Sequence, residues 1–522
     1  MIDFLNITPD RSECPDLVDR LQRRDASLWS DDPEIRRDIE NRLGWLDAAN
    51  FMDRHAGRVV DFARQVQGEG YQQAVLLGMG GSSLAPEVYA ALFGGRPGAL
   101  PLTVLDTTCP GHIAAVTARC EAVPTLFIVS SKSGTTAETS ALEAHFFDRM
   151  ASREGAPGRR FIAVTDAGSP LAALATERGY RDTFLNPEDI GGRFSALSFF
   201  GLIPAALAGA EPAALRAPMP TELPGSDLAT EACALGTALA TAAREGRNKL
   251  TLCFSPGLAA VAPWVEQLID ESTGKDGTGI VVVAGEPRFE AGAYSNDRFF
   301  VVVELADESV DEAWLDRLAG LGHPVARWRM ADSNHVGAEF FRWQVATAAA
   351  GRGLGINPFD EPDVNASKAE TRAILEQPGG TGAAPPDPLS ALREMLNGAA
   401  PSDYIAILAY VSPGDANREA LATLRERLTR LTGLPCCPGF GPRYLHSSGQ
   451  VHKGGPDQGL FIVITREAEP DLPIPGQRHG FGSLIRAQAL GDLRVLRERG
   501  RRVVHLELSD GMSLEGLLDY VW

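Results

Sequence analysis

The stretch TLFIVSSKSGTTAET, residues 125–139, decides the fold class of this chain. It begins with an apolar run of strand length, continues through a turn of glycine and small hydroxyl residues, and leads into a helical stretch. The same order recurs in AVLLGMGGSS at 74–83, LTVLDTT at 102–108 and FIAVTDAGSP at 161–170. This alternation predicts an α/β fold with doubly wound parallel sheets flanked by helices, and it places ligand chemistry at the carboxyl ends of the strands.

Two proline-rich segments divide the chain. EPAALRAPMPTELPGSD at 211–227 and QPGGTGAAPPDPLS at 377–390 separate regions that each repeat the pattern of strand, turn and helix. At 522 residues the chain is also too long for one hydrophobic core. We therefore expect a helical N-terminal segment at 1–65, α/β domains at 66–212 and 226–376, and an α/β C-terminal segment at 390–522.

The composition argues against several classes of partner. A formal net charge of −19 disfavours binding to nucleic acid or to an anionic membrane surface. No apolar run reaches the length of a membrane span, and the N-terminus lacks the basic and apolar regions of an export signal, so we expect a cytoplasmic protein. The same negative charge offers a phosphate group no long-range attraction. Any phosphate site must therefore be built locally.

The cysteines indicate neither disulfides nor a metal site. There are seven, an odd number, and they are scattered without the spacing of metal ligands. Cys436 and Cys437 are adjacent, which is a poor geometry for a disulfide. We expect reduced thiols and no bound metal.

The turn after the TLFIVS run has the chemistry of a phosphate site. It contains the hydroxyls of Ser131, Ser133, Thr135 and Thr136 together with the cation of Lys132. Hydroxyl donors, free backbone N–H groups and the positive end of a helix dipole suit a phosphate dianion. An ordinary helix cap needs only one such hydroxyl, so the pattern favours phosphate binding.

A second glycine-rich turn, LLGMGGSSLAPE at 76–87, allows the backbone at Gly81 and Ser82 to approach a ligand closely. It partly matches a dinucleotide fingerprint, with Asp106 at the end of the next predicted strand. However, the third small position of that fingerprint is Ser83, and a hydroxyl-rich phosphate loop follows. We therefore disfavour a dinucleotide and expect no cofactor.

Three more motifs accompany these loops: PEDIGGRFSALSFFGLIP at 187–204, WVEQLIDESTGK at 264–275 and LGINPFDEPDVNASK at 354–368. Together the motifs resemble the phosphoglucose isomerases, which interconvert glucose 6-phosphate and fructose 6-phosphate in glycolysis and gluconeogenesis. The resemblance implies tandem sugar isomerase (SIS) domains at 66–212 and 226–376, a hexose 6-phosphate substrate and a homodimer.

The C-terminal third carries a more specific likeness. RYLHSSGQVHKGGP at 443–456 and FGSLIRAQALGD at 481–492 are similar to the isomerase portion of fused transaldolase and phosphoglucose isomerase proteins. No part of the sequence resembles the transaldolase barrel, so a free-standing isomerase is expected.

The resemblance also implies roles for individual residues. Aldose-ketose isomerisation needs a base that moves a proton between C1 and C2, a partner for the enediolate charge, and an acid or base that opens the ring. Glu271 matches the family's base, Arg193 matches the arginine beside the reacting carbons, and Lys368 matches the lysine that contacts the ring oxygen. Without the motifs, these residues would be interpreted as a surface carboxylate, a salt-bridge arginine and a solvated lysine.

The ring-opening histidine is a choice between two positions. The histidine nearest the family's usual loop is His335, but alignment of the GAEFF segment puts Glu339 at the expected place. The HKGGP segment instead favours His452, with His446 as the alternative. This rearranged order along the chain allows donation from a neighbouring subunit.

Three other functions compete with an isomerase. A non-catalytic module that binds sugar phosphates would need the phosphate loop but neither Glu271 nor Lys368. Glucosamine-phosphate synthesis would need a nucleophilic N-terminal cysteine, and the first cysteine is Cys14 in a polar segment. A nicotinamide-dependent oxidoreductase is disfavoured by Ser83. Acceptance of mannose 6-phosphate depends on the fit of one hydroxyl, which the sequence leaves open.

Overall fold

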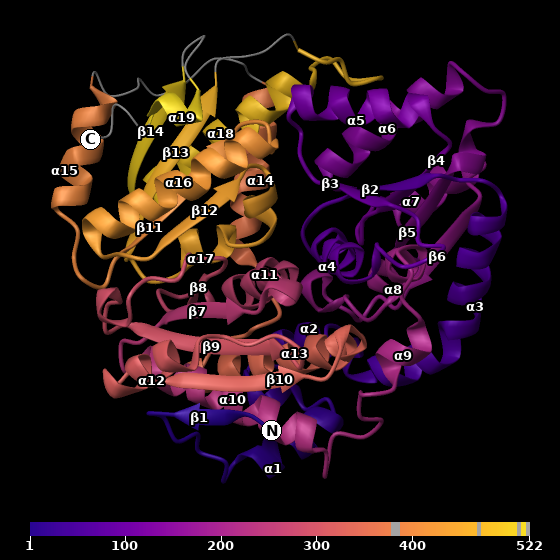
Figure 1. The fold of residues 1–522 in the computed structure, drawn as a ribbon. Helices are drawn as coiled ribbons and strands as arrows, with labels where there is room; N and C mark the ends of the chain where they lie inside the picture. The colour runs from indigo at the N-terminus through magenta and orange to yellow at the C-terminus, as the bar shows by residue number, and fades with distance from the viewer. Residues whose placement is uncertain (377–386, 467–470, 509–512, 518–522) are drawn as a thin grey trace.

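The computed structural model describes residues 1–376, 387–466, 471–508 and 513–517. Three β-sheets form its framework, and helices lie against their faces (Figure 1). In that view the first and third sheets stand next to each other above the second. The predicted α/β class, with parallel sheets flanked by helices, is confirmed.

The first sheet has the order β3-β2-β4-β5-β6, and all its neighbouring strands are parallel. Its strands are β2 (Gln73–Gly78), β3 (Leu102–Leu105), β4 (Thr125–Ser130), β5 (Phe161–Asp166) and β6 (Asp182–Asn186). The helices of this part are α3 (Ala48–Gly68), α4 (Leu84–Phe93), α5 (Pro110–Ala122), α6 (Ala137–Ala151), α7 (Pro170–Glu177), α8 (Phe199–Leu207) and α9 (Pro212–Arg216). The strand order reverses between β2 and β4, where a doubly wound sheet opens a crevice for ligands.

The second sheet has the order β1-β10-β9-β7-β8. Its strands are β1 (Asp3–Leu5), β7 (Lys249–Phe254), β8 (Val281–Val283), β9 (Arg298–Leu305) and β10 (Val325–Met330). Its helices are α10 (Asp227–Arg244), α11 (Ala262–Thr273), α12 (Glu312–Gly320) and α13 (Val336–Leu354). The four later strands are parallel, whereas β1 pairs antiparallel with β10 at the edge. The N-terminal segment thus contributes a strand as well as the helices α1 (Cys14–Gln22) and α2 (Pro33–Glu40).

The third sheet is parallel and has the order β12-β11-β13-β14. Its strands are β11 (Tyr404–Tyr410), β12 (Cys436–Phe440), β13 (Gly459–Arg466) and β14 (Arg502–Leu508). The helices of this part are α14 (Pro362–Glu376), α15 (Pro388–Asn397), α16 (Asp415–Thr432), α17 (Gly449–Gly454), α18 (Phe481–Glu498) and α19 (Leu514–Leu517).

Alternation along the strands divides the buried side chains between the two faces of each sheet. In β2, Ala74 and Leu76 belong to one buried cluster and Val75 and Leu77 to another. The cluster with Leu76 also contains Leu250 of the second sheet, so the first two sheets share a continuous core. The third sheet packs its helices around two further clusters, one of which also contains Val281 of β8. This arrangement brings the carboxyl ends of strands from different sheets toward the centre of the molecule.

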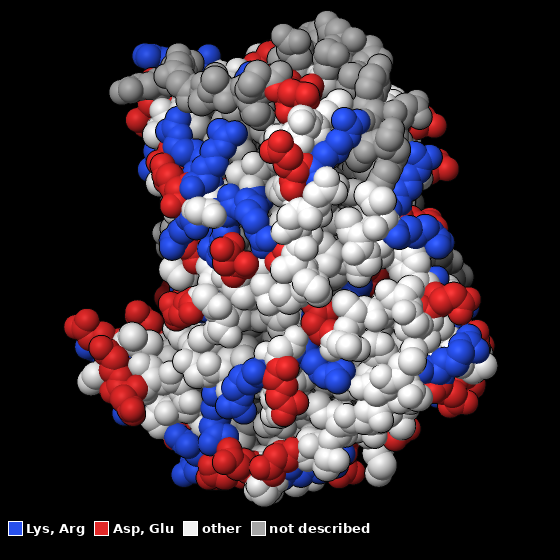
Figure 2. Space-filling view, turned by 90° about the vertical axis from the view of Figure 1, so that its left-hand side faces the viewer, with Lys and Arg blue, Asp and Glu red and all other residues white. Residues whose placement is uncertain are grey.

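Acidic side chains outnumber basic ones in this chain, but the two kinds are not segregated on the surface. On the face shown in Figure 2, acidic and basic side chains are interspersed. Within the described ranges, no helix combines the length and the apolar character needed to cross a membrane.

Candidate active site

The loop between β4 and α6 is shaped by its own hydroxyl groups. The Gly134 N–H donates to Ser131 Oγ at 3.2 Å, and Ser131 Oγ lies 3.0 Å from Thr136 Oγ1. Gly134 has a φ of +66°, and a Cβ there would lie 2.7 Å from the backbone nitrogen of Leu171, so this turn requires glycine. Thr136 is the N-cap of α6, which makes no side-chain cap hydrogen bond. The first N–H groups of α6 are therefore available for an anion.

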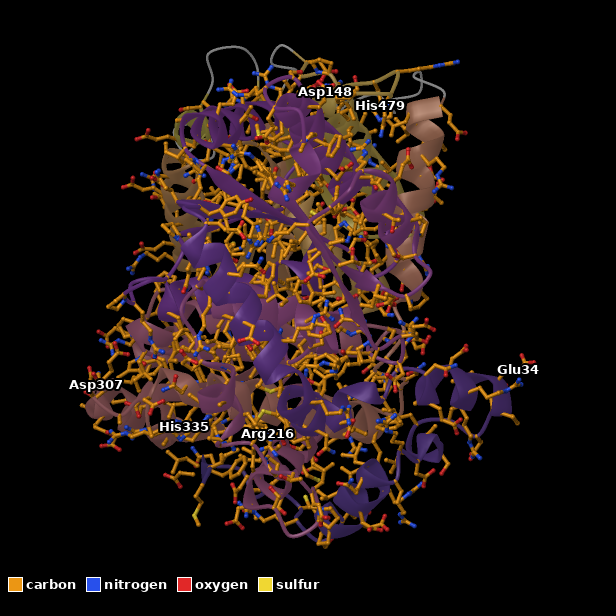
Figure 3. All side chains as sticks on the ribbon, turned by 90° about the vertical axis from the view of Figure 1, so that its right-hand side faces the viewer. Glu34, Asp148, Arg216, Asp307, His335 and His479 are labelled. Atoms are coloured by element: carbon orange, nitrogen blue, oxygen red, sulfur yellow. The ribbon has the colours of Figure 1, made fainter. Side chains whose placement is uncertain are left out.

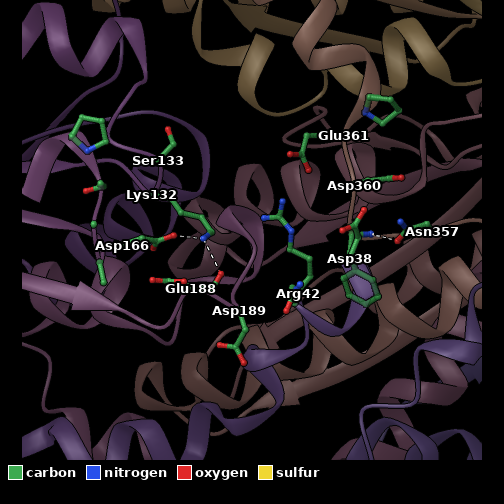
Figure 4. A pocket seen from close by; sticks show the side chains of 17 residues that line it. Asp38, Arg42, Lys132, Ser133, Asp166, Glu188, Asp189, Asn357, Asp360 and Glu361 are labelled. Carbon is green, nitrogen blue, oxygen red and sulfur yellow. Dashed lines mark hydrogen bonds and ion pairs between the residues drawn. The ribbon is translucent and has the colours of Figure 1, made fainter. Parts of the chain in front are cut away.

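Lys132 points to the side of this loop. Its ammonium group forms an ion pair with Asp166 and donates to the carbonyl of Glu188 at 3.0 Å. Figure 4 shows this pair at the wall of a basin of about 1170 Å³. Carboxylates outnumber cations around the basin, which is lined by Asp38, Asp166, Glu188, Asp189, Asp360 and Glu361 against Arg42 and Lys132. Ser133 and Glu361 connect the basin with the phosphate loop and with Arg193.

The second glycine-rich turn packs against the segment that carries Arg193. Gly81 and Ser82 lie in a 3-10 turn, η3 (Gly80–Ser82), and Arg193 lies in another, η5 (Gly192–Phe194). A Cβ on Gly81 would stand only 2.0 Å from the carbonyl oxygen of Gly192. Glycine at position 81 thus permits the two loops to touch, and it fixes Arg193 relative to the end of β2.

Arg193 and Glu271 form a buried pair at the end of α11. Arg193 is 3% exposed, and its Nη1 donates to Glu271 Oε1 at 3.2 Å and to Glu361 Oε2 at 3.0 Å. Its Nε donates to Ser272 Oγ at 2.8 Å, and Nη2 donates to backbone carbonyls. Burial raises the pKa of Glu271, and the nearby charge of Arg193 opposes this effect. A buried carboxylate beside a fixed cation is suited to proton transfer next to a developing negative charge.

Gln267 joins this pair to the third sheet. It lies one helical turn before Glu271, and its Nε2 donates to Glu271 Oε2 at 3.0 Å and to the carbonyl oxygen of His446 at 2.8 Å. His446 ends the 3-10 turn η9 (Arg443–His446), which follows β12. The side chain of Gln267 therefore connects Glu271 with the backbone of His446.

The imidazole of His446 faces a carboxylate of the first sheet. Its Nε2 lies 2.9 Å from Oε1 of Glu138, in the first turn of α6. Gln488 Nε2 donates to the same oxygen at 2.7 Å. Burial would raise the pKa of Glu138, but the charge and hydrogen bond of His446 outweigh it and lower that pKa. Because an ionised carboxylate only accepts hydrogen bonds, Nε2 carries hydrogen and Nδ1 is left for a ligand.

His452 has a different environment. It lies in α17, is 3% exposed, and its Nδ1 is 3.0 Å from the hydroxyl oxygen of Tyr404. The rings of Tyr404, Tyr444 and Phe461 surround it. Burial lowers the pKa of His452 to about 3. The contacts of His452 are those of a neutral core residue.

Comparison with known proteins decides the family. The model of the phosphoglucose isomerase family matches residues 47–212. A glucose-6-phosphate isomerase from Symbiobacterium thermophilum is 31% identical over 393 residues, which are 64% of this chain and 87% of that protein. Another from Heliobacterium modesticaldum is 29% identical over 394 residues, covering 64% of this chain and 88% of that protein.

The chain belongs to the phosphoglucose isomerase family.

Solved structures share the fold of this chain. A hypothetical protein from Thermus thermophilus superposes with a TM-score of 0.59 at 25% identity, covering 72% of this chain and all of that one. A glucose-6-phosphate isomerase from Chlamydia trachomatis has a TM-score of 0.52 at 19% identity and shares the fold, covering 70% of this chain and 84% of that one. The first two sheets have the parallel α/β architecture that the sequence predicted.

Two further residues considered from the sequence lie outside the buried pair of Arg193 and Glu271. Lys368 is exposed on α14, and its charge contributes to lowering the pKa of Glu138. His335 pairs with Asp332 at the periphery, where its side chain is 40% exposed (Figure 3). Lys368 is thus near the His446 pair, whereas His335 is not grouped with the other candidates.

Sequence reasoning missed Glu138 and Gln267. Glu138 stands in the opening stretch itself, two positions after Thr136, and a carboxylate in the first turn of a helix at a phosphate loop is a signal of its own. Gln267 precedes Glu271 by four residues and so shares its helix face. Among the residues that the structure describes, no three His, Cys, Asp or Glu side chains are grouped so that they could hold a metal ion.

Proposed function

We propose that the chain is a glucose-6-phosphate isomerase that reversibly interconverts glucose 6-phosphate and fructose 6-phosphate, in the direction of glycolysis or gluconeogenesis. The observation that carries this proposal is the bridge through Gln267, which holds Glu271 and the His446 segment together at hydrogen-bond distance. An acid-base pair for ring opening and a base for proton transfer are thereby combined beside a phosphate loop. The family of the chain supports the same reaction.

The phosphate of the substrate is assigned to the loop after β4. Ser131, Ser133, Thr135 and Thr136 offer hydroxyl groups, and the start of α6 offers backbone N–H groups. Lys132 forms an ion pair with Asp166 at the edge of the loop, where its ammonium group contributes positive charge. The turn at Gly81 and Ser82 closes the opposite side through its contact with the Arg193 segment.

The isomerisation step is assigned to Glu271 and Arg193. With the phosphate in the loop, Glu271 takes the proton from C2 and returns it to C1, which produces a cis-enediolate between the two transfers. Arg193 is fixed by Ser272 and by backbone carbonyls, so its charge is already in place when the enediolate forms. Lys368 is assigned to the ring oxygen, as the resemblance implies.

We assign ring opening to His446 rather than to His452. His446 has a carboxylate partner, Glu138, that orients its ring. The charge of His446 also acts to lower the pKa of Glu271. His452 is enclosed by aromatic rings and has no comparable partner within the described residues. Because His446 and Glu138 belong to the same chain, ring opening needs no residue from a neighbouring subunit. We also propose that the protein is a cytoplasmic homodimer and that its C-terminal third is similar to the isomerase portion of fused transaldolase proteins.

The direct test is turnover of fructose 6-phosphate by the purified protein, with glucose 6-phosphate detected by a coupling dehydrogenase added separately. We expect isomerisation without any added nicotinamide cofactor in the primary reaction. Reduction of a dinucleotide by the protein itself, with no aldose formed, would contradict the assignment.

A dilution series tests the claim that one chain holds the whole site. Specific activity should stay constant while sedimentation shows dissociation to single chains. If activity is lost in parallel with dissociation, a neighbouring subunit completes the site.

A further inference from the structure

A second cavity lies behind the active site, where the three sheets meet. It has a volume of about 260 Å³. Three strands end at it: Asp106 follows β3, Ala284 follows β8, and Phe440 is the last residue of β12. Figure 1 shows α11 at this meeting point, at the centre of the molecule. The carboxyl ends of parallel strands are where α/β proteins bind ligands, and here three sheets contribute to one such place.

Two helix N-termini open into the cavity. The first residues of α11, Ala262 and Pro263, line it, and so does Pro413 immediately before the N-cap of α16. Neither helix has a side-chain cap hydrogen bond. The positive ends of two helix dipoles therefore face the same space, which favours an anion.

Arg425 is a second observation, separate from the helix N-termini, that indicates a ligand in this cavity. It lines the cavity from α16 and is 5% exposed. Its Nη1 donates to the carbonyl oxygen of Ala284 at 2.8 Å, but its Nε and Nη2 are buried with no hydrogen-bond partner. A buried guanidinium group with two unused donors costs free energy unless something accepts from them. Those two donors have the spacing that suits two oxygens of a carboxylate or phosphate.

Other charges around the cavity are already in use or lie at its edge. Arg443 is held by Glu87 and by Asp106, the latter at 2.9 Å. Arg418 lies over the ring of Phe440, 5.5 Å from its centroid, at the opening. Glu266 lines the cavity from α11, and burial raises its pKa to about 7. Among these arginines, Arg425 is the deeply buried one with unused donors.

We propose that this cavity binds a small oxyanion, a phosphate- or carboxylate-bearing metabolite held by Arg425, which acts as an effector of the enzyme. The volume is below that of a site for drug-sized ligands, so the occupant is small. The site is separate from the phosphate loop after β4.

Its position explains why occupation would affect catalysis. The helix α11 presents Glu266 to the cavity and Gln267 and Glu271 to the active site. The turn η9 likewise carries Arg443 at the cavity and His446 at the active site. An anion at Arg425 therefore acts on the two elements that position the base and the ring-opening histidine.

Isothermal titration tests the binding. Inorganic phosphate and, separately, succinate are titrated into the Glu271→Gln protein saturated with fructose 6-phosphate, so that the phosphate loop is filled. We expect one binding event per chain with at least one of the two probes, and the probe that binds identifies the chemical source. Arg425→Gln should weaken it about tenfold or more, whereas Arg430→Gln, an exposed arginine on the same helix, should leave it unchanged.

A second variant separates recognition from folding. Glu266→Gln removes a carboxylate that faces the anion, so it should bind the same probe severalfold more tightly, an effect that mere damage to the structure would not produce. In the wild-type protein, the bound probe should change kcat at saturating fructose 6-phosphate by at least about twofold, and Arg425→Gln should abolish this change.

Three results would overturn the proposal: no binding of either probe, no binding event that Arg425→Gln weakens, or an unchanged kcat at an occupancy that titration has established. If the proposed isomerase function itself failed, fructose 6-phosphate would leave the phosphate loop empty. Titration would then show an additional event that is insensitive to Arg425→Gln.

Discussion

His446 and His452 lie six residues apart in one motif, yet the fold gives them opposite environments. His446 ends η9 and reaches across to Glu138 of the first sheet. His452 turns into the core of the third sheet against Tyr404. The neighbouring carboxylate keeps one imidazole oriented for proton exchange, whereas the aromatic rings keep the other neutral. A histidine's partner, rather than its motif, decides whether it can act in catalysis.

The largest loss of activity is expected from a change at Glu271, the proposed base. Glu271→Gln keeps the shape and the Gln267 contact but cannot accept a proton, so kcat should fall about 10⁴-fold while fructose 6-phosphate still binds. Steady-state isomerisation and titration with substrate measure the two quantities. Activity close to that of the wild type would remove Glu271 from the mechanism.

Matched variants of the two histidines test the comparison most directly. His446→Gln should reduce turnover of ring-closed glucose 6-phosphate about 10²-fold, because ring opening loses its acid-base group. His452→Gln should leave turnover within about twofold, because this residue only packs in the core. Rates measured from pure cyclic anomers report the ring-opening step. The opposite ranking of the two variants would transfer the role to His452.

Replacement of Glu138, the carboxylate that pairs with His446, should have a smaller effect on turnover. Glu138→Gln keeps a hydrogen-bonding side chain but loses the charge that orients His446, so turnover of the cyclic substrate should fall about tenfold. A double variant with His446→Gln should be little worse than His446→Gln alone, since both changes act on one unit. Simple multiplication of the two losses would show that the residues act independently.

The pH dependence of catalysis distinguishes the buried base from a surface one. Burial raises the pKa of Glu271 above its ordinary value of 4.5, and the base works in its ionised form. As the pH is lowered, kcat/KM should therefore begin to fall at a higher pH than an exposed glutamate would cause. A pH profile of kcat/KM in non-phosphate buffers measures this limb. A flat profile down to the ordinary glutamate range would contradict it.

Replacement of His452, which should change activity least, should also change the free energy of unfolding. The pKa of His452 is about 3 in the folded chain, against an ordinary value of 6.5. Between these values the unfolded chain binds a proton that the folded chain does not, so the free energy of unfolding is largest above pH 6.5 and decreases as the pH falls toward 3. His452→Gln should lose about 2 kcal/mol at neutral pH and should show a shallower acid slope, by up to about 1.4 kcal/mol per pH unit. Denaturant unfolding at several pH values measures both quantities, and an unchanged slope would show that His452 is not the buried neutral group.

The hydroxyl-rich turn after β4 and the parallel sheets could be predicted from the sequence, because both depend on local order. An apolar strand, a glycine at a positive φ and a run of hydroxyls occur within the single stretch from 125 to 139. The pair of Arg193 with Glu271 required the family motifs, since its members are 78 residues apart. The geometry that connects them is set by the close contact of Gly81 with Gly192, which no local pattern displays.

By itself, the sequence determined the α/β class, the hydroxyl-rich turn after β4 and the family. Only the tertiary structure showed the different environments of the two histidines, because His446 meets a carboxylate 308 residues away in the chain. The same is true of the cavity at Arg425, whose walls come from three different sheets. Contacts of this kind depend on how the sheets pack together. The residues next to one position in the sequence do not show which distant segment it will contact.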